Sequence, residues 1–199
     1  MDVFFFIPGY AVVMELLPIL RPSALLVVCA TSAASEPVSR LIAELALRDA
    51  VTVLDGGNRF QPYRVTHLLR QQTSEVNSAA KRIFIRRAFT CYQMLALLEG
   101  TPSLRQPYII LDLLSTFYDD HVPAHEVRRL LEACLRQVER LGRLAPVMVA
   151  LAPPLIPERA FLVEMVCARA DRLLMPEIST PVETQPSLFA DYCSLKTGN

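Results

Sequence analysis

Short apolar runs alternate along the chain with stretches in which apolar residues recur at helical spacing. The runs are typical of buried strands in a parallel sheet, and the periodic stretches are typical of amphipathic helices. Strands are predicted over residues 25–29, 50–55, 82–85, 108–112, 147–151 and 172–175, and helices over residues 38–47, 65–72, 92–99, 123–141 and 158–169. This alternation predicts an α/β fold with a mainly parallel sheet covered by helices on both faces.

The same alternation indicates how the chain is organised. We expect an N-terminal arm over residues 1–20, one core domain over residues 21–175 and a C-terminal tail over residues 176–199, where the rhythm of strands and helices is lost. A boundary inside the core is not expected, because each buried strand needs its neighbours to cover both of its faces.

Composition and charge narrow the class of protein. Of the 199 residues, 52% are hydrophobic and 20% are charged, which indicates a globular protein. Basic and acidic residues number 20 each, so contact with nucleic acid or an anionic membrane requires a local patch. The five cysteines include no CxxC pair, which argues against a zinc site or a disulfide framework and favours a reducing compartment.

The N-terminal residues are apolar but do not have the pattern of a targeting or membrane segment. Asp2 stands where a signal peptide needs basic charge, and Pro8 and Pro18 interrupt any spanning helix. We therefore expect a cytoplasmic protein, or a nuclear one in a eukaryote, that does not associate with membranes.

The segment between the first predicted strand and helix is where a nucleotide-binding loop would stand. Such a loop follows the pattern GxxxxGK[ST], because its glycines turn backbone amides toward phosphate, its lysine reaches the outer phosphates and its hydroxyl binds magnesium. Here the first glycine position is Ala30, and the GK[ST] positions are Ser35, Glu36 and Pro37. An acid replaces the cation and a proline replaces the hydroxyl, so we expect no nucleotide cofactor.

Three later segments carry a family resemblance in their order and spacing. Residues 53–64 read VLDGGNRFQPYR, residues 83–90 read IFIRRAFT and residues 108–118 read YIILDLLSTFY. They resemble, in turn, the acid-ended strand with its F-x-P-x-R stretch, the strand with an R-A-F triplet and the Walker B strand of the RecA-like recombinase superfamily, especially the archaeal and eukaryotic strand-exchange recombinases and their paralogues. The resemblance spans residues 23–174 and implies a RecA-like core of the P-loop type.

The chain departs from the active members of that family at the positions that carry chemistry. Their catalytic glutamate, two residues after the acid of the second strand, corresponds here to Gly57, while Asp112 corresponds to the Walker B acid near magnesium. With the lysine, the hydroxyl and this glutamate absent, we expect a pseudo-ATPase with no catalytic residues. The resemblance then implies a non-catalytic accessory or scaffold protein in DNA recombination or repair. The alternatives are a divergent nucleotide-binding ATPase and a scaffold in an unrelated pathway.

Two surfaces are candidates for binding. Lys81, Arg82, Arg86 and Arg87 could contact DNA, although strand alternation places Arg82 and Arg86 on one face and Arg87 on the other. The alternative is solvated strand ends with one arginine paired to an acid.

The aromatic residues Phe4, Phe5 and Phe6 are the second candidate surface. The family's subunits often dock through an N-terminal strand, so the resemblance implies a RecA-like partner or self-association through these residues. The F-x-x-A docking pattern is not found there, and the alternative is an arm that packs on its own core.

Two other groups suggest chemistry but have simpler interpretations. The acids and histidines between Asp119 and Glu126 resemble a metal site, but Pro123 separates the two histidines, so we expect a solvated loop and helix start and no metal. Cys29 and Cys91 have no histidine near them in the sequence, and we expect both thiols to be buried and unreactive.

Overall fold

A computed structural model of the chain describes residue 20 and residues 23–29, 36–152 and 157–174. Within these residues six strands form one sheet in the order β3-β2-β4-β5-β1-β6, and every neighbouring pair is parallel. The strands are β1 (Leu25–Cys29), β2 (Val51–Asp55), β3 (Ile83–Arg87), β4 (Tyr108–Leu111), β5 (Val147–Leu151) and β6 (Arg172–Leu174). The four inner strands are apolar along almost their whole length because helices cover both faces.

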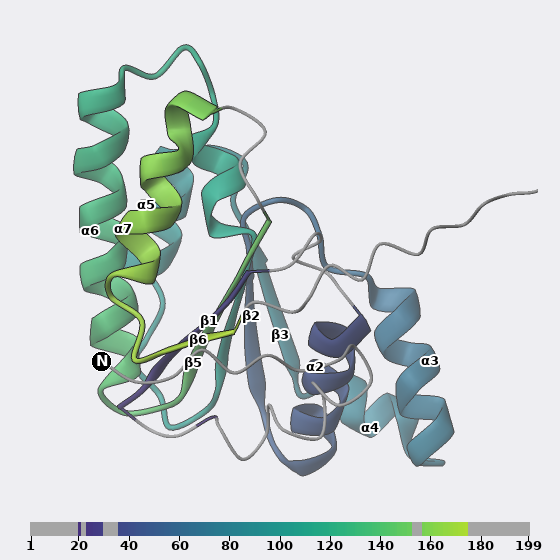
Figure 1. Cartoon of the computed structure of the whole chain (residues 1–199). Helices are drawn as coiled ribbons and strands as arrows, with labels where there is room; N and C mark the ends of the chain where they lie inside the picture. Colours follow the sequence, from purple (N-terminus) through teal and green to yellow (C-terminus); the bar gives the residue numbers. More distant parts are fainter. Residues whose placement is uncertain (1–19, 21–22, 30–35, 153–156, 175–199) are drawn as a thin grey trace, which may run out of the picture.

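Helices form one layer on each side of the sheet. Figure 1 shows α2, α3 and α4 on one side, and α5, α6 and α7 on the other. Their bounds are α2 (Glu36–Arg48), α3 (Pro62–Gln72), α4 (Val76–Ala80), α5 (Cys91–Glu99), α6 (Ala124–Gly142) and α7 (Ala160–Cys167), with short 3₁₀ turns η1 (Leu113–Phe117) and η2 (Pro157–Arg159). The α/β fold expected from the sequence is confirmed, and its parallel sheet is consistent with a RecA-like core.

Each side of the sheet has its own hydrophobic core, as the alternation of strand side chains requires. Leu54 and Ile110 point toward α5 and α6, whereas Val53 and Ile109 point toward α2 and α3. The long helix α6 closes the first core with one apolar face, made of Val127, Leu130, Leu131, Cys134, Leu135, Val138 and Leu141. The two cores hold the carboxyl ends of β2 and β4 next to each other.

The structure differs from the predicted elements mainly at their ends. Helix α3 begins at Pro62, three residues before its predicted start, because a proline fits the first turn of a helix. The strand predicted over residues 82–85 runs instead from Ile83 to Arg87. Neither α4 nor η1 is predicted from the sequence. Helix α4 buries a single side chain, Ala79, so its sequence has no helical period.

Several expectations fall on residues that the structure does not describe. Phe4, Phe5 and Phe6 of the N-terminal arm, Ala30 to Ser35 of the loop after β1 and the C-terminal tail all lie outside the described residues. In the described part of the chain, no helix has the length and apolar character needed to cross a membrane.

Candidate functional site

The topology places a candidate site at the carboxyl ends of β2 and β4. Strand β2 leads into α3 on one side of the sheet, while its neighbour β4 leads through η1 into α6 on the other. Ligands of parallel α/β sheets bind where neighbouring strands diverge in this way. A second divergence lies between β1 and β5, but the loops that follow these strands, residues 30–35 and 153–156, are outside the described residues.

Asp55 ends β2 and is fully buried. Its Oδ1 accepts a hydrogen bond of 2.8 Å from the backbone N–H of Arg59, and its Oδ2 accepts one of 3.0 Å from the backbone N–H of Phe60. Oδ2 also accepts a bond of 3.2 Å from Nε of Arg87, which lies beside it on β3. The carboxylate therefore closes the turn after β2 and joins it to the edge strand, which is a structural role.

Asp112 follows β4 and has a left-handed backbone, with φ of 50° and ψ of 50°. Its Oδ2 accepts a hydrogen bond of 3.0 Å from Nε of Arg59, while its buried Oδ1 has no partner among the described residues. An aspartate tolerates this backbone conformation better than most residues do. Asp112 is thus held in an ion pair within the chain.

Gly57 lies so close to Asp112 that an added side chain would force its neighbours to move. A Cβ atom at this position would lie 2.7 Å from Oδ2 of Asp112 and 2.9 Å from Oγ of Ser115. The hydroxyl of Ser115 donates to the carbonyl oxygens of Gly56 and Asp112, at 3.0 Å each, and so fixes η1 against the turn. Position 57 therefore lacks a side chain, and neighbouring atoms occupy the space that a side chain would need.

The negative charges of this site are neutralised by arginines of the same chain. The two buried acids, Asp55 and Asp112, each pair with a partly exposed arginine, Arg87 and Arg59 respectively. A divalent cation bound by either acid would have to compete with a guanidinium already in place. The arrangement is well suited to fixing two strand ends and poorly suited to holding magnesium.

The start of α2 is equally unsuited to phosphate. Glu36 lies in the first turn of α2, followed by Pro37, and accepts a hydrogen bond of 3.0 Å from Arg40 one turn later. A negative side chain here already complements the positive end of the helix dipole and would repel a phosphate group.

The four residues of the basic cluster do not form one cationic surface. Arg82 donates to the carbonyl oxygens of Ala46 and Leu47 at the end of α2, and Arg86 donates to the carbonyl oxygen of Gly100 at the end of α5. Arginine in these places stabilises the carboxyl ends of helices. Arg87 pairs with Asp55, which agrees with the alternative of one arginine paired to an acid. Lys81 is exposed. DNA contact through this cluster stays a prediction.

The residues from Asp119 to Glu126 form local pairs. Asp119 accepts hydrogen bonds from the backbone and ring of His121, which lower the pKa of this carboxyl. Glu126 pairs with Arg129 one turn later in α6. Among the residues that the structure describes, no three histidine, cysteine or acidic side chains lie close enough together to hold a metal ion.

Cys29 has a neighbour that sequence reasoning missed. Its sulfur lies 4.0 Å from that of Cys167, the last residue of α7, and both side chains are half-buried. A hydrogen bond from Cys29 lowers the pKa of Cys167 to about 7, and the pKa of Cys29 is raised in turn. Two cysteines 138 residues apart give no spacing signal, so only the fold could reveal this pair. The expectation of a buried, unreactive thiol holds better for Cys91, which is buried and whose pKa is raised by desolvation.

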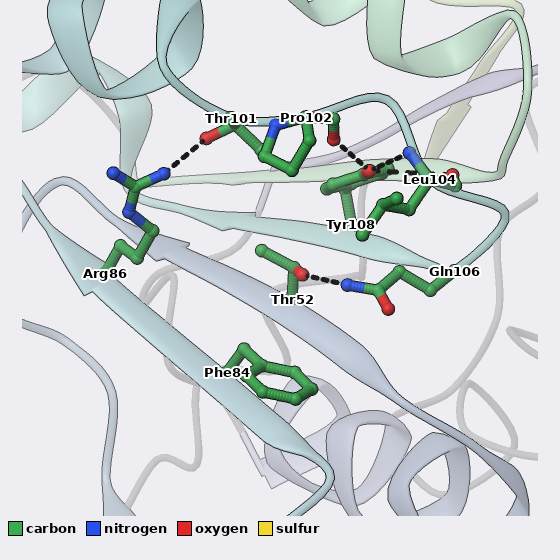
Figure 2. Close-up of a pocket in the computed structure, with 8 residues that line it drawn as sticks. All are labelled: Thr52, Phe84, Arg86, Thr101, Pro102, Leu104, Gln106 and Tyr108. Atoms are coloured by element: carbon green, nitrogen blue, oxygen red, sulfur yellow. Dashed lines mark hydrogen bonds between the residues drawn. The ribbon is translucent and has the colours of Figure 1, made fainter.

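A hollow of about 220 Å³ lies over β2, β3 and β4 (Figure 2), and neither Asp55 nor Asp112 lines it. Its wall is mostly apolar, and its polar groups bond to each other: the hydroxyl of Tyr108 donates to the carbonyl oxygen of Pro102, and the amide of Gln106 donates to Thr52. The lining residues are Thr52, Phe84, Arg86, Thr101, Pro102, Leu104, Gln106 and Tyr108. Apart from Arg86, none of them was a candidate from the sequence.

Phe84 of β3 lines the hollow, and other large apolar side chains on and near this strand are also exposed, with Ile85 on the opposite face of the sheet. Phe84 is 53% exposed and Phe89 is 67% exposed, and Ile85, Tyr92 and Leu104 are also exposed. Strand β3 lies at the edge of the described sheet and has β2 as its neighbour. Large apolar residues grouped at a strand edge are typical of a surface that another protein covers.

The comparisons with known proteins give no further information about this site. None of the known protein families matches the chain, and no curated protein matches it either. The fold and the geometry described above therefore carry the functional argument.

Proposed function

We propose that the protein is a non-catalytic RecA-like accessory or scaffold protein that acts in DNA recombination or repair by binding another RecA-like protein. One observation carries the non-catalytic part of this proposal. Gly57 and Asp112 stand at the two positions where the family's catalytic groups are expected. Asp112 is paired with Arg59, and a side chain at Gly57 would clash with Asp112 and Ser115. Among the described residues, this arrangement leaves no side chain at position 57 to orient an attacking water.

The exposed edge of β3 supports the partner-binding part. Strand β3 contains Phe84, is followed closely by Phe89 and lies at the end of the described sheet, so its outer edge offers backbone groups for an added strand, and the adjacent hollow offers space for an apolar side chain. Both features are common in protein recognition, because backbone pairing provides affinity and a pocket provides specificity. The partner would then contribute an extended segment with at least one large apolar residue.

A divergent nucleotide-binding protein is the second candidate, and one observation favours it. Oδ1 of Asp112 is buried without a hydrogen-bond partner among the described residues, and buried polar atoms normally have one. A nucleotide or its metal ion bound next to Asp112 would satisfy it.

The purified protein is expected to release no phosphate from ATP above the buffer background, with magnesium and with or without single-stranded DNA. The physical reason is that Glu36, Pro37 and Gly57 occupy the catalytic positions. Phosphate release and the binding of a fluorescent ATP analogue are measured on the same preparation. Turnover that disappears in Asp112→Ala, while Asp49→Ala keeps it, would overturn the non-catalytic assignment, and binding without turnover would favour the second candidate.

Replacing Phe84 with serine is expected to weaken binding to the RecA-like ATPase of the same organism by about 30-fold, because central aromatic anchors contribute about 2 kcal/mol or more to an interface. Leu144→Ser is the matched control, since Leu144 is 48% exposed and lies beyond the end of α6. Light scattering reports the complex and circular dichroism reports the fold.

Deletion of residues 1–7 in the same assay tests the separate expectation that the N-terminal arm takes part. Equal affinities for Phe84→Ser and Leu144→Ser would place the interface away from β3. A deletion variant that stays folded and binds as before would remove Phe4, Phe5 and Phe6 from the interface.

A further inference from the structure

The fold brings together two cysteines that the proposed function does not use. Cys29 is the last residue of β1 and Cys167 is the last residue of α7, and their sulfur atoms lie 4.0 Å apart. The two residues are 138 positions apart in the sequence, so they meet only because β1 and α7 pack into the same hydrophobic core. A pair of thiols held this close is a candidate site of thiol chemistry.

This pair differs from the other cysteines that the structure describes. Cys91 and Cys134 are buried in the core, and desolvation raises the pKa of Cys91 and raises that of Cys134 to about 12. Both therefore stay protonated and are shielded from small solutes. Cys29 and Cys167 are only half-buried, so a small oxidant can reach them.

The hydrogen bond within the pair prepares one sulfur for reaction. The thiol of Cys29 donates to the sulfur of Cys167 and lowers the pKa of Cys167 to about 7, although partial burial acts in the opposite direction. About half of the Cys167 side chains are then thiolates at neutral pH, and the thiolate is the nucleophilic form of cysteine. A second thiol beside an oxidised cysteine is the usual arrangement of a redox-sensitive site.

We propose that Cys29 and Cys167 form a peroxide-sensitive dithiol site, in which hydrogen peroxide converts the two thiols to an intramolecular disulfide and a dithiol reductant restores them. In the first step the Cys167 thiolate attacks one peroxide oxygen, so that an S–O bond forms, the O–O bond breaks and hydroxide leaves. In the second step the sulfur of Cys29 attacks the sulfur of Cys167, the S–S bond forms, and the departing hydroxide takes the Cys29 proton as water. The two sulfurs are oxidised and one peroxide is reduced to two waters.

The positions of the two residues allow the bond to form. The sulfurs must approach from 4.0 Å to about 2.05 Å, the length of a disulfide bond. Each cysteine ends its element, and Cys167 is followed by the turn that leads to β6, so small adjustments there leave the sheet intact. The disulfide would tie the end of β1, just before residues 30–35, to the end of α7. In a reducing compartment such a bond is transient, as expected of a regulatory site.

A metal site fits the pair less well. A structural zinc ion needs four ligands, and among the described residues no third histidine, cysteine or acid is grouped with these two sulfurs. The dithiol site also goes beyond the proposed function. It uses neither the acids at the ends of β2 and β4 nor the edge of β3, so it can hold or fail independently of partner binding.

The test is peroxide oxidation of the reduced full chain, after removal of the reductant, over a series of hydrogen peroxide concentrations. The protein is then denatured, its remaining thiols are alkylated, and intact mass and non-reduced tryptic peptides are measured. Of the five cysteines, two are expected to escape alkylation, with a mass loss of two hydrogen atoms and a peptide that joins Cys29 to Cys167. Dithiothreitol is expected to restore all five thiols.

Two variants separate the steps. Cys29→Ser removes the resolving thiol, so no disulfide forms and the sulfenic acid of Cys167 is expected to accumulate, where dimedone captures it. Cys193→Ser is the matched control, at a cysteine outside the described residues, and is expected to form the bond as the wild type does. Circular dichroism verifies the fold of each variant. Peptide mapping of the wild type needs no substitution, so it tests the pairing even if Cys29→Ser does not fold.

Three results would overturn the proposal. The first is a wild type that keeps all five thiols at peroxide concentrations that oxidise free glutathione. The second is a disulfide that joins other cysteines or two separate chains, because the pairing then does not follow from the contact between β1 and α7. The third is a folded Cys29→Ser variant in which dimedone does not label Cys167, which would remove Cys167 as the residue that attacks the peroxide.

Discussion

Replacing Asp55 with alanine is expected to lower the free energy of unfolding by about 3–5 kcal/mol, because each backbone N–H group that loses this buried acceptor costs about 1–3 kcal/mol. The substitution removes the acceptor for the backbone N–H groups of Arg59 and Phe60, and it leaves Arg87 without its partner. Buried donors that lose their acceptor keep the full cost of desolvation. Urea unfolding followed by circular dichroism measures the change.

Two further variants make this result interpretable. Asp49→Ala removes an exposed acid just before β2, which bonds to the backbone N–H of Ala50, and is expected to change stability by less than about 1 kcal/mol. Asp55→Asn keeps one acceptor oxygen and loses the charge, so an intermediate loss is expected even if the alanine variant does not fold. If Asp55→Ala and Asp49→Ala prove equally stable, the turn after β2 does not depend on the buried carboxylate.

Replacing Gly57 with alanine is expected to destabilise the protein by about 2–3 kcal/mol, the upper range for inserting a methyl group into a packed site. The added carbon would lie 2.7 Å from Oδ2 of Asp112 and 2.9 Å from Oγ of Ser115. Neither neighbour can move freely, because Asp112 is paired with Arg59 and Ser115 bonds to two carbonyl oxygens. Thermal and urea unfolding report the loss.

Gly142→Ala is the matched control, since it adds the same methyl group at the last residue of α6. The nearest atom there, Cγ2 of Val147, is 3.8 Å away, which is an ordinary contact. Alanine is a better helix former than glycine, so this variant is expected to be as stable as the wild type or more stable by up to about 1 kcal/mol. A Gly57→Ala variant with wild-type stability would mean that η1 can withdraw from the turn, and the site would then have space for a larger side chain.

Much of the fold could be predicted because its strands are buried on both faces. The strand predicted from the apolar run 147–151 has the correct bounds, because a strand buried on both faces is apolar along its whole length. The predicted bounds of the edge strand β3 are displaced, because the apolar run ends at Ile85 whereas the strand continues through the charged residues Arg86 and Arg87. The short helix α4 has too few buried residues to produce a period.

The candidate site was predictable in its residues but not in its contacts. Asp55, Gly57 and Asp112 were singled out from strand ends and motif spacing, and the structure brings all three to the same edge of the sheet. The roles of Arg59 and Arg87 as their partners depend on side-chain reach across neighbouring elements, which a one-dimensional pattern does not encode. The hollow beside β3 could not be predicted for the same reason, because its lining residues come from three strands and a loop.

The position of β1 in the sheet has a consequence for synthesis. Its neighbours are β5 and β6, with Leu25 paired to Val147 and Leu26 paired to Arg172. At a translation rate of 5–20 residues per second, β1 leaves the ribosome about 6–25 s before β5 does. During that time β1 is an apolar segment without either of the neighbours that it has in the described sheet, so binding by a chaperone would protect it from aggregation.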